Sequence, residues 1–374
     1  MFLLLFLGVL LVWYVSRRIY AHCWHRGLSV EIYFQERFIY EGDASTMKEV
    51  VVNDKLLPLP ALEIRFSSNR NLEFVGEASA NTSSTDRSYK RDVFSFLFHQ
   101  RIERTLSFTA HKRGFYQIYD ASLTAYDFFF RSGYYADTHP DTVLYVYPRQ
   151  VDTHRIAMLC QAISGTVLSR NRLHPDPFEF SGIREYRRED PMNRINWKAS
   201  ARTGELMVNQ FDSTTAISLT VLFDVEDKLI LKYEDLVEET LRIVSSLCGR
   251  LVKDRMSFTV SGNGPDADAD TPFSMYLKAG AGKIADLNQK LACMDTAGCV
   301  CSAPELLRSQ AALKRDGHTF VFISKNWQVD LAGAMSELTG RDNQLLWVLP
   351  IRSADASSLS LPSLARVRVI PWEI

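Results

Sequence analysis

The sequence predicts an α+β protein with two domains, an antiparallel β-sandwich followed by an α/β domain, behind an apolar N-terminal helix. Three observations predict this class. Residues 2–15 carry no charge. From Leu28 to about Pro148, apolar and polar residues alternate with a period of two, which is typical of half-buried strands. After residue 212, short apolar runs alternate with long amphipathic segments, which predicts strands connected by helices.

The uncharged run at residues 2–15 would be about 21 Å long as a helix, which is shorter than the roughly 30 Å hydrocarbon core of a membrane. Extending the helix to Tyr20, with Arg17 and Arg18 reaching toward the headgroups, makes a single membrane span feasible. A cleaved signal peptide is the alternative, but no basic residue precedes the run and no small-x-small cleavage site follows it. Because the cations follow the span, we expect a transmembrane anchor at residues 1–20 with the bulk of the chain facing the cytoplasm.

The first domain, residues 28–148, is predicted to be the antiparallel β-sandwich. Short alternating segments end at turn-forming residues such as Gly42 and Pro58. The apolar positions of these segments are Leu28, Val30, Ile32, Phe34, Leu62, Ile64, Phe66, Phe94, Phe96, Phe98, Leu144 and Val146. Several short strands with this spacing are typical of a sandwich. Residues 78–92, rich in Ser, Thr and Asn, are expected to form an exposed loop.

Residues 149–212 are predicted to connect the two domains. A short helix is expected at residues 153–163, and a strongly polar stretch follows from Phe178 to Asp212. Within this stretch, Asp190 followed by Pro191 predicts the start of a second helix. The Asp side chain can accept hydrogen bonds from free backbone N–H groups, and Pro loses no hydrogen bond at the first helical position.

The helix that begins after Asp190 is expected to end in a left-handed turn at Gly204. Arg194, Lys198 and Arg202 recur at four-residue steps, so they would line one basic face of this helix. These cations could pair with nearby glutamates as an ordinary solvated face. They could instead form a docking face for an acidic partner or an anionic ligand.

The same stretch resembles the signature of a bacterial family known as "domain of unknown function 58". The resemblance rests on the run G-x-R-E-Y-x-x-x-D-P-x-x-x-I-N-W-K-A-S-A-R-T-G-E-L. The residues that carry it are Gly182, Arg184, Glu185, Tyr186, Asp190, Arg194, Trp197, Ser200, Ala201, Arg202 and Gly204. Glu189 departs from the pattern, because members often have Gly there. Residues 113–116 and 144–149 also resemble landmarks of the family, so the resemblance covers most of the chain.

This resemblance implies a membrane segment, a β domain and a von Willebrand factor A-like domain, located at the inner (cytoplasmic) membrane. Genes of the family often neighbour those of MoxR-type AAA+ ATPases, which implies such an ATPase as a protein partner. We therefore expect a non-enzymatic, membrane-anchored scaffold that serves the assembly or maturation of protein complexes. Its partner-binding residues would be Arg184, Glu185, Tyr186, Asp190, Arg194, Trp197, Lys198, Ser200 and Arg202.

The second domain, residues 213–374, is predicted to be an α/β domain. Strands are expected at residues 217–223, 257–260, 319–323, 345–349 and 367–370, and helices at 232–253, 284–294, 304–314 and 329–338. This alternation implies right-handed crossovers and a mainly parallel sheet. The length, the order of elements and the Asp after the first strand resemble a von Willebrand factor A (Rossmann-like) domain.

Domains of that kind often hold a divalent ion beyond the carboxyl ends of the strands, in a D-x-S-x-S loop. Here the loop reads Asp224-Val225-Glu226-Asp227-Lys228, so both serines are replaced, and Lys325 follows a later strand. A lysine repels Mg²⁺ and cannot serve as its ligand. We expect a degenerate site at Asp224, Glu226, Asp227 and Lys325. Either the acidic cluster binds a weak ion, or Lys228 and Lys325 neutralise Asp224.

Other chemistry is not indicated by the sequence. The 43 basic and 44 acidic residues nearly cancel, so no overall field favours nucleic acid as a partner. The glycine-rich segment 279–283 is not a P-loop, because Ile284 stands where Ser or Thr should bind Mg²⁺. We expect no catalytic residues and no cofactor. The alternative function is a metal-dependent hydrolase that uses the acidic cluster at Asp224–Asp227.

Overall fold

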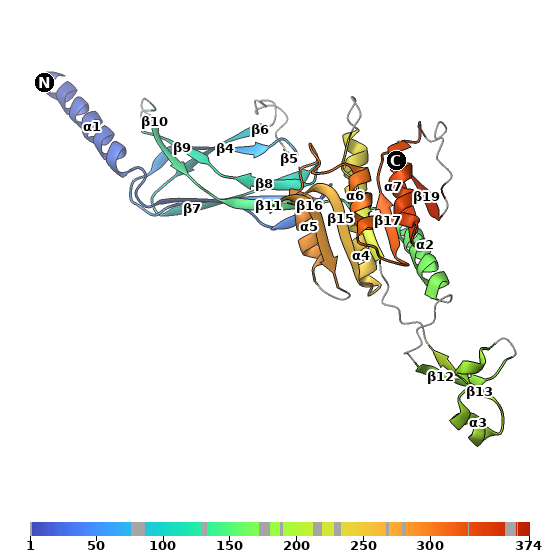
Figure 1. Ribbon diagram of the computed structural model, residues 1–374. Coiled ribbons are helices and arrows are strands. Elements are labelled where there is room, and N and C mark those ends of the chain that lie inside the picture. Colours follow the sequence, from blue (N-terminus) through green and yellow to red (C-terminus); the bar gives the residue numbers. More distant parts are fainter. Residues whose placement is uncertain are drawn as a thin grey trace. The chain divides into compact units, whose positions relative to one another are not determined.

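A computed structural model of the chain divides into two compact units, Met1–Arg149 and Gln150–Ile374 (Figure 1). The first is called the β unit and the second the α/β unit. The structure describes residues 2–75, 87–128, 130, 133–171, 180–187, 190–211, 219–227, 233–266, 269–278, 282–327, 329–355, 364 and 366–374. The mixture of sheets and helices is the class that the sequence predicts.

Helix α1 runs from Phe2 to Cys23 and exposes apolar side chains such as Phe6 and Leu7. Its last turn belongs to the β unit, because Tyr20, the expected end of the anchor, is buried in the core of that unit. Trp24, just after the helix, is buried there as well. In the part of the chain that the structure describes, no helix is long and apolar enough to cross a membrane.

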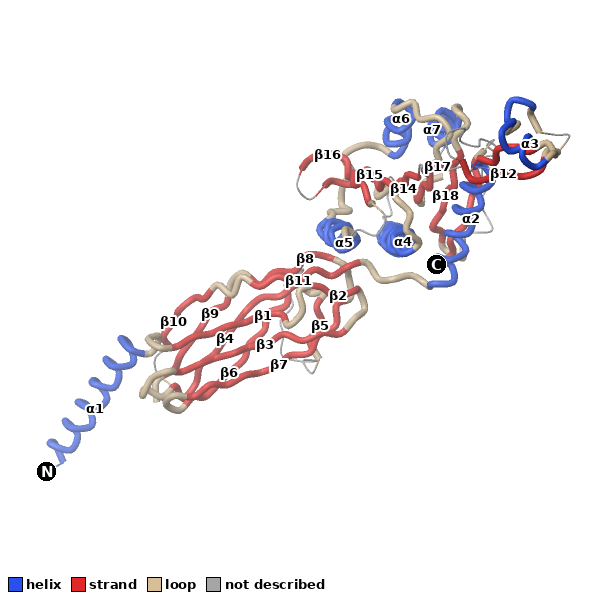
Figure 2. Tube along the Cα trace, turned by 90° about the horizontal axis from the view of Figure 1, so that it is seen from below, coloured by secondary structure: helices blue, strands red, loops and turns tan. Residues whose placement is uncertain are grey.

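The β unit consists of short strands in three sheets (Figure 2). The strands are β1 (Leu28–Phe34), β2 (Phe38–Tyr40), β3 (Ala44–Asn53), β4 (Leu59–Asn69), β5 (Leu72–Phe74), β6 (Arg87–Phe96), β7 (Gln100–Ala110), β8 (Gly114–Ile118), β9 (Ala121–Tyr126), β10 (Gly133–Thr138) and β11 (Thr142–Tyr147). The sheet orders are β1-β3-β7-β5, β10-β9-β4-β6 and β2-β11-β8. The described pairs are antiparallel, as predicted, except that β2 and β11 run parallel.

Alternate residues of these strands face a single apolar core, which explains the period of two in the sequence. On β6, Phe94 and Phe96 are buried. The strand ends at Phe96, so Phe98, which was expected to continue the alternation, is 60% exposed. Residues 87–92, expected in an exposed loop, form the first part of β6. The rest of that predicted loop, up to residue 86, lies outside the described residues.

Charged side chains are also buried in the β unit. Glu49 on β3 is 0% exposed, and neither of its carboxylate oxygens has a hydrogen-bond partner among the described residues. Burial raises the pKa of Glu49 to about 8, with a further contribution from the nearby negative charge of Asp92, although Lys90 and Arg104 oppose the shift. Glu49 therefore holds a proton at neutral pH in the folded protein.

The raised pKa of Glu49 predicts that the β unit loses stability as the pH rises. The folded state binds a proton that the unfolded state releases near pH 4.5, so this stabilisation is complete below about pH 4.5. It is lost as the pH rises through about 8. As the pH rises from 5 to 8, we expect the free energy of unfolding to fall by a few kcal/mol because of Glu49.

Urea denaturation of the full chain at pH 5 and pH 8 measures this loss. Glu49→Gln should make the stability of the β unit nearly independent of pH over this range, because the amide does not titrate. Glu31→Gln, which changes an exposed carboxyl on β1, is the matched control and should keep the wild-type dependence. A wild-type stability that rises with pH over the range would contradict the prediction.

The α/β unit is built on one six-stranded sheet with the order β16-β15-β14-β17-β18-β19. Its strands are β14 (Leu219–Phe223), β15 (Phe258–Asp266), β16 (Ala269–Leu277), β17 (Thr319–Ile323), β18 (Gln344–Ile351) and β19 (Val367–Glu373). Its helices are α2 (Thr153–Asn171), α4 (Glu234–Lys253), α5 (Ile284–Cys293), α6 (Ala303–Ala312) and α7 (Val329–Thr339). Neighbouring strands are parallel except for β15 and β16, so the sheet is mainly parallel, as predicted.

Both faces of this sheet are covered by helices (Figure 2). One apolar core joins α2, α4 and α5 to the sheet, and another joins α6 and α7 to the opposite face. The central strands β14 and β17 are accordingly buried along their whole length. The order of the strands reverses between β14 and β17, which is where the ligand crevice of such sheets forms, at the carboxyl ends of the strands.

Helix α2 is longer than the helix expected at residues 153–163, and it packs in the core of the α/β unit. Ile156, Leu159, Cys160 and Ile163, spaced by three and four residues, are all buried there. The stretch 149–212, predicted as a connector, therefore contributes a core helix. Residues 172–179, 188–189 and 212 of this stretch lie outside the described residues.

Strand β16 was not expected, because Gly262–Asp270 reads as a glycine-rich and acidic loop in the sequence. Instead β15 extends to Asp266 and pairs with β16. Gly262 is required within β15 because a Cβ atom there would overlap the ring of Phe223 on the neighbouring strand. Glycine in this segment therefore serves close packing of two strands rather than a turn.

Candidate functional site

The polar stretch that resembles the family signature forms a small module of its own, residues 180–187 and 190–211, which we call the signature module. It contains strand β12 (Phe180–Glu185), the 3₁₀ turn η1 (Met192–Arg194), helix α3 (Trp197–Thr203) and strand β13 (Met207–Phe211). β12 and β13 pair antiparallel. Ile195 and Val208, which pair across from one another, are both buried in this module.

The single helix predicted between Asp190 and Gly204 is interrupted. Ile195 and Asn196 are not helical, because Ile195 is buried against Val208 and Asn196 N–H donates to the backbone of β13. Helix α3 therefore starts late, with the Asn196 side chain accepting from Ala199 N–H at 3.0 Å as its N-cap. The left-handed end at Gly204 is confirmed, with φ of 79°.

Asp190 does not cap a helix but pairs with Arg184. The two side chains form a bidentate ion pair, with N···O distances of 2.6 and 2.7 Å, and Asp190 also accepts from Arg187 N–H at 2.8 Å. The Arg184 guanidinium, followed by the Arg187 N–H, lowers the pKa of Asp190 to about 2. The guanidinium of Arg184 is therefore engaged in holding β12 to the segment before η1.

Ser200 and Tyr186 are also engaged inside the module. Ser200 Oγ donates to Asn196 O and accepts from Met207 N–H, both at 2.8 Å, which ties α3 to β13. Tyr186 N–H donates to Leu206 O, and the Tyr186 hydroxyl lies 3.8 Å from the Met192 sulfur. These contacts give both residues an architectural role.

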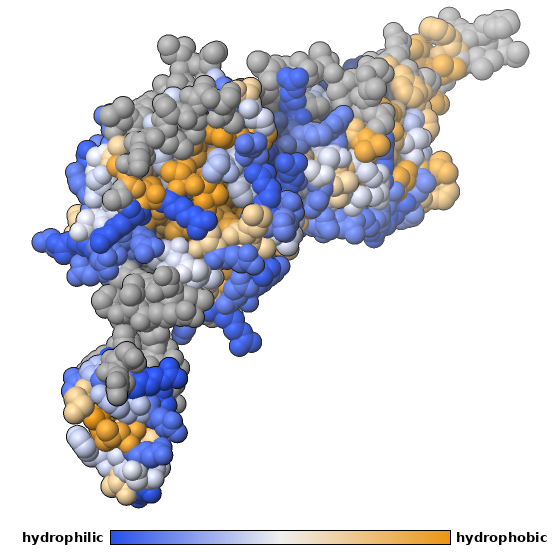
Figure 3. Space-filling view, turned by 90° about the vertical axis from the view of Figure 1, so that its right-hand side faces the viewer, coloured by the Kyte–Doolittle hydropathy of each residue, from blue (hydrophilic) through white to orange (hydrophobic). Residues whose placement is uncertain are grey.

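Trp197, Lys198 and Arg202 remain exposed, and we call them the α3 face. Trp197 is 67% exposed at the first position of α3, and Lys198 and Arg202 lie one helical turn apart. Met192, before α3, is also exposed. Figure 3 shows apolar side chains gathered on this module, at the lower left, with hydrophilic ones around them. Arg194 precedes α3 and is half-buried, so it does not share a helical face with Lys198 and Arg202.

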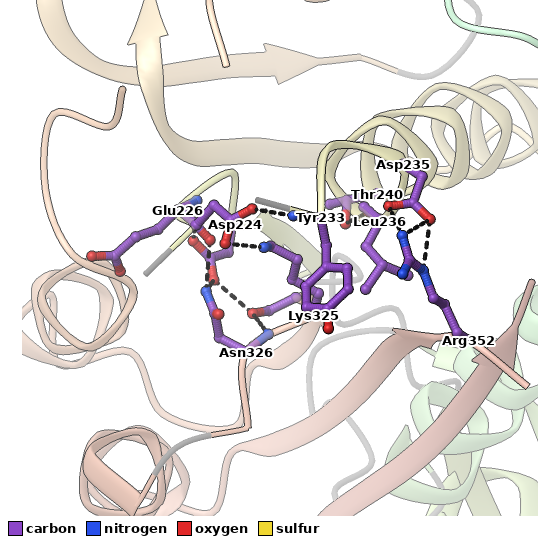
Figure 4. Close-up of polar contacts among 11 residues, drawn as sticks. Asp224, Glu226, Tyr233, Asp235, Leu236, Thr240, Lys325, Asn326 and Arg352 are labelled. Carbon is purple, nitrogen blue, oxygen red and sulfur yellow. Dashed lines mark hydrogen bonds and ion pairs between the residues drawn. The ribbon is translucent and has the colours of Figure 1, made fainter. Parts of the chain in front are cut away.

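The second candidate site lies at the carboxyl ends of β14 and β17, where Asp224 is completely buried (Figure 4). Its Oδ1 accepts from Asn263 Nδ2 at 2.6 Å and from Glu226 N–H at 2.9 Å. Its Oδ2 accepts from Ser324 Oγ at 2.6 Å and from Asn326 Nδ2 at 2.7 Å. Four donors thus surround this carboxylate, and they leave little room for a cation to bind it.

Asp227 pairs with Lys325, which follows strand β17. Lys325 Nζ lies 2.7 Å from Asp227 Oδ1, and both side chains are buried. The geometry of this contact does not suit a hydrogen bond, so charge holds the pair. Asp227 Oδ2 accepts from Tyr233 N–H at 2.7 Å, which fixes the start of α4. The Tyr233 ring lies between Lys325 and Arg352, and Arg352 also forms an ion pair with Asp235 (Figure 4).

This arrangement corrects one detail of the prediction for the degenerate metal site. Lys325 neutralises Asp227 rather than Asp224, which neutral donors satisfy. Lys228, the other cation considered for this role, lies outside the described residues. Glu226 turns away from the crevice, and its Oε2 accepts from Ala303 N–H at the start of α6. No group of three Asp, Glu, His or Cys side chains in the described ranges is placed to hold a metal ion.

The residues that sequence reasoning missed are the neutral donors Asn263, Ser324 and Asn326. Each stands within or just after a strand adjoining β14, where the carboxyl ends of a parallel sheet converge. This position in the sequence, at the ends of predicted neighbouring strands, could have indicated that these side chains lie close to Asp224. An Asn or Ser there can replace the cation that a buried carboxylate otherwise needs.

Comparisons with known proteins do not assign the chain to a family. No family model and no curated protein matches it. Matching solved structures include a CARDB domain from Pyrococcus furiosus, in complex with di-metal ions, at 15% identity and a TM-score of 0.20, over 31% of this chain and 94% of that one. A non-cellulosomal cohesin from Archaeoglobus fulgidus matches at 8% identity and a TM-score of 0.21, over 35% of this chain and 97% of that one. A type II cohesin domain from Acetivibrio cellulolyticus matches at 9% identity and a TM-score of 0.22, over 31% of this chain and 94% of that one.

Proposed function

We propose that the chain is a non-enzymatic protein-interaction scaffold that binds partner proteins through the α3 face. The observation that carries this proposal is the exposure of Trp197, Lys198 and Arg202 on one short helix. By contrast, the side chains of Arg184, Asp190 and Ser200 are bonded inside the module. Tryptophan and arginine are enriched among the residues that dominate protein interfaces.

A metal-dependent hydrolase is the weaker candidate. A catalytic metal needs carboxylate oxygens that face an open coordination position. Asp224 already accepts four hydrogen bonds, Asp227 pairs with Lys325, and Glu226 caps α6. Their lone pairs are therefore used within the protein, which favours a structural role for the cluster.

The resemblance to the "domain of unknown function 58" family extends this proposal. It suggests that the α/β unit is von Willebrand factor A-like, and the strand order around β14 is compatible with that. It also suggests a MoxR-type AAA+ ATPase as the partner, and assembly or maturation of protein complexes as the process. Attachment to the inner membrane through α1, with the rest in the cytoplasm, is part of the same proposal. Its support is the uncharged run at residues 2–15.

Affinity capture from cells tests the scaffold proposal. The full chain should retain a defined partner protein, and the double substitution Lys198→Glu/Arg202→Glu should abolish retention. Lys278→Glu, which reverses an exposed charge after β16, is the matched control and should retain the partner. Equal capture by all three proteins would contradict the proposal.

The same double substitution should leave the protein folded. Lys198 and Arg202 are exposed, and neither forms an ion pair among the described residues, so reversing both should change the free energy of unfolding by less than about 1 kcal/mol. Thermal denaturation of the two proteins side by side measures this. A large drop in stability would show that the cations are structural.

A further inference from the structure

We infer that the α3 face recognises an acidic protein segment that carries a large apolar side chain. This inference rests on the proposed docking function and names the chemistry of the partner. Three properties of the signature module support it: the exposed apolar surface, the uncompensated positive charge and the rigid attachment of α3.

The apolar component is centred on Trp197. This side chain is 67% exposed and Met192 is 65% exposed. Leu206 and Ile183 of the same module are 46% and 42% exposed, so several large apolar side chains of this small module stay in water. The side chains of Trp197 and Met192 are largely in water, so neither contributes much to the stability of the module by burial. An aromatic ring that contributes little to folding and stays in water is suited to bury an apolar group of a partner.

The charge of the module specifies which partners suit it. Its described part has five basic and three acidic residues; the basic ones are Arg184, Arg187, Arg194, Lys198 and Arg202, and the acidic ones are Glu185, Asp190 and Glu205. The Arg184–Asp190 pair is internal. Lys198 and Arg202 repel each other weakly across one helical turn, because like charges at this spacing are unfavourable. A carboxylate-bearing partner relieves this repulsion, whereas a basic one increases it.

Rigidity makes such binding effective. The N-cap by Asn196, the Ser200 bonds to Asn196 and Met207, and the left-handed turn at Gly204 fix both ends of α3. The three side chains of the α3 face therefore project from a backbone that loses little freedom on binding. The indole of Trp197 would contact the apolar residue, and Lys198 and Arg202 would pair with flanking carboxylates.

A peptide library tests the inference directly. Random 12-residue peptides displayed on phage are selected on the immobilised full-length protein, with counter-selection on Lys198→Glu/Arg202→Glu. The enriched peptides should have a net negative charge and at least one Phe, Trp, Leu or Met. Failure to enrich any peptide, or enrichment of neutral or basic peptides, would overturn the inference.

Fluorescence anisotropy with a labelled enriched peptide then separates the two components of binding. Trp197→Ala and Lys198→Glu/Arg202→Glu should each weaken binding at least tenfold, while Lys278→Glu should leave it within twofold of wild type. Replacing the apolar residue of the peptide with Ser should weaken binding by a similar factor. If polyglutamate or a single-stranded oligonucleotide binds as well as the peptide, charge alone is recognised and the inference fails.

These outcomes are distinguishable from failure of the proposed function. If the library gives no acidic peptides but the captured cellular partner still depends on Lys198 and Arg202, docking stands and only the chemistry assigned to the partner is wrong. If neither experiment depends on the α3 face, both the inference and the proposed function are wrong.

Discussion

Replacing Asp224 with alanine is expected to destabilise the α/β unit by roughly 3–5 kcal/mol, because four buried donors would lose their acceptor at once. Asn263 Nδ2, Ser324 Oγ and the backbone N–H of Glu226 would each be left without an acceptor. Asn326 Nδ2 would lose one of its two acceptors and keep its bond to Glu226 O. Water cannot readily replace the carboxylate at a position that is 0% exposed.

Urea denaturation of the full chain measures this loss. Asp316→Ala removes an aspartate whose side chain is 77% exposed, and it should change the stability by less than about 0.5 kcal/mol. If Asp224→Ala were as stable as the wild type, the four donors would not depend on the carboxylate, and the closed crevice would lose its explanation.

Replacing Lys325 with methionine is expected to destabilise the same unit by about 3–5 kcal/mol, because it leaves the buried charge of Asp227 without its counter-ion. The side chains of the pair are only 2% and 9% exposed, so solvent screens the charge weakly. The double substitution Lys325→Met/Asp227→Asn removes both charges. It should recover most of the lost stability, because a neutral pair of similar volume needs no counter-ion.

The double-mutant cycle isolates the interaction between these two side chains. A coupling energy of a few kcal/mol would support the ion pair as the interaction that holds Asp227 in place and, through it, the start of α4. If Lys325→Met alone left stability unchanged, or the double substitution were as destabilising as the single one, the ion pair would not hold the start of α4.

Helices with strong local signals were predicted well from the sequence. Helix α6 begins within one residue of its predicted start, because Ser302 and Glu305 form a complete capping box there. The helix predicted at residues 232–253 ends where predicted because its apolar residues recur at helical spacing up to Leu251. In both cases the signals lie within a few residues of each other, so no distant part of the chain is needed to read them.

Features that depend on distant contacts could not be predicted in this way. The break at Ile195 comes from burial against Val208, thirteen positions later, which overrides a helix start at Asp190-Pro191. The three side-chain donors around Asp224 lie 39 to 102 positions along the chain. Strand β16 pairs with β15, whereas the glycine and acidic residues at 262–270 indicate a loop there. Long-range pairing decides these elements, and a single sequence contains no direct record of it.

The sequence predicts nine partner-binding residues in the signature module, and the structure divides them into residues that hold the module together and residues that remain exposed. Arg184, Asp190 and Ser200 hold the signature module together. Trp197, Lys198 and Arg202 remain exposed. The sequence places both groups in one stretch of similar polarity, so only the side-chain contacts distinguish them.

Site-specific cross-linking in cells tests the central claim most directly. A photoreactive amino acid in place of Ala201, which is exposed one helical turn after Trp197, should form an adduct with a defined protein. The same adduct should be absent when the probe replaces Lys278 or when Lys198→Glu/Arg202→Glu is added. The absence of any protein adduct at position 201, or an adduct that persists after charge reversal, would contradict the account.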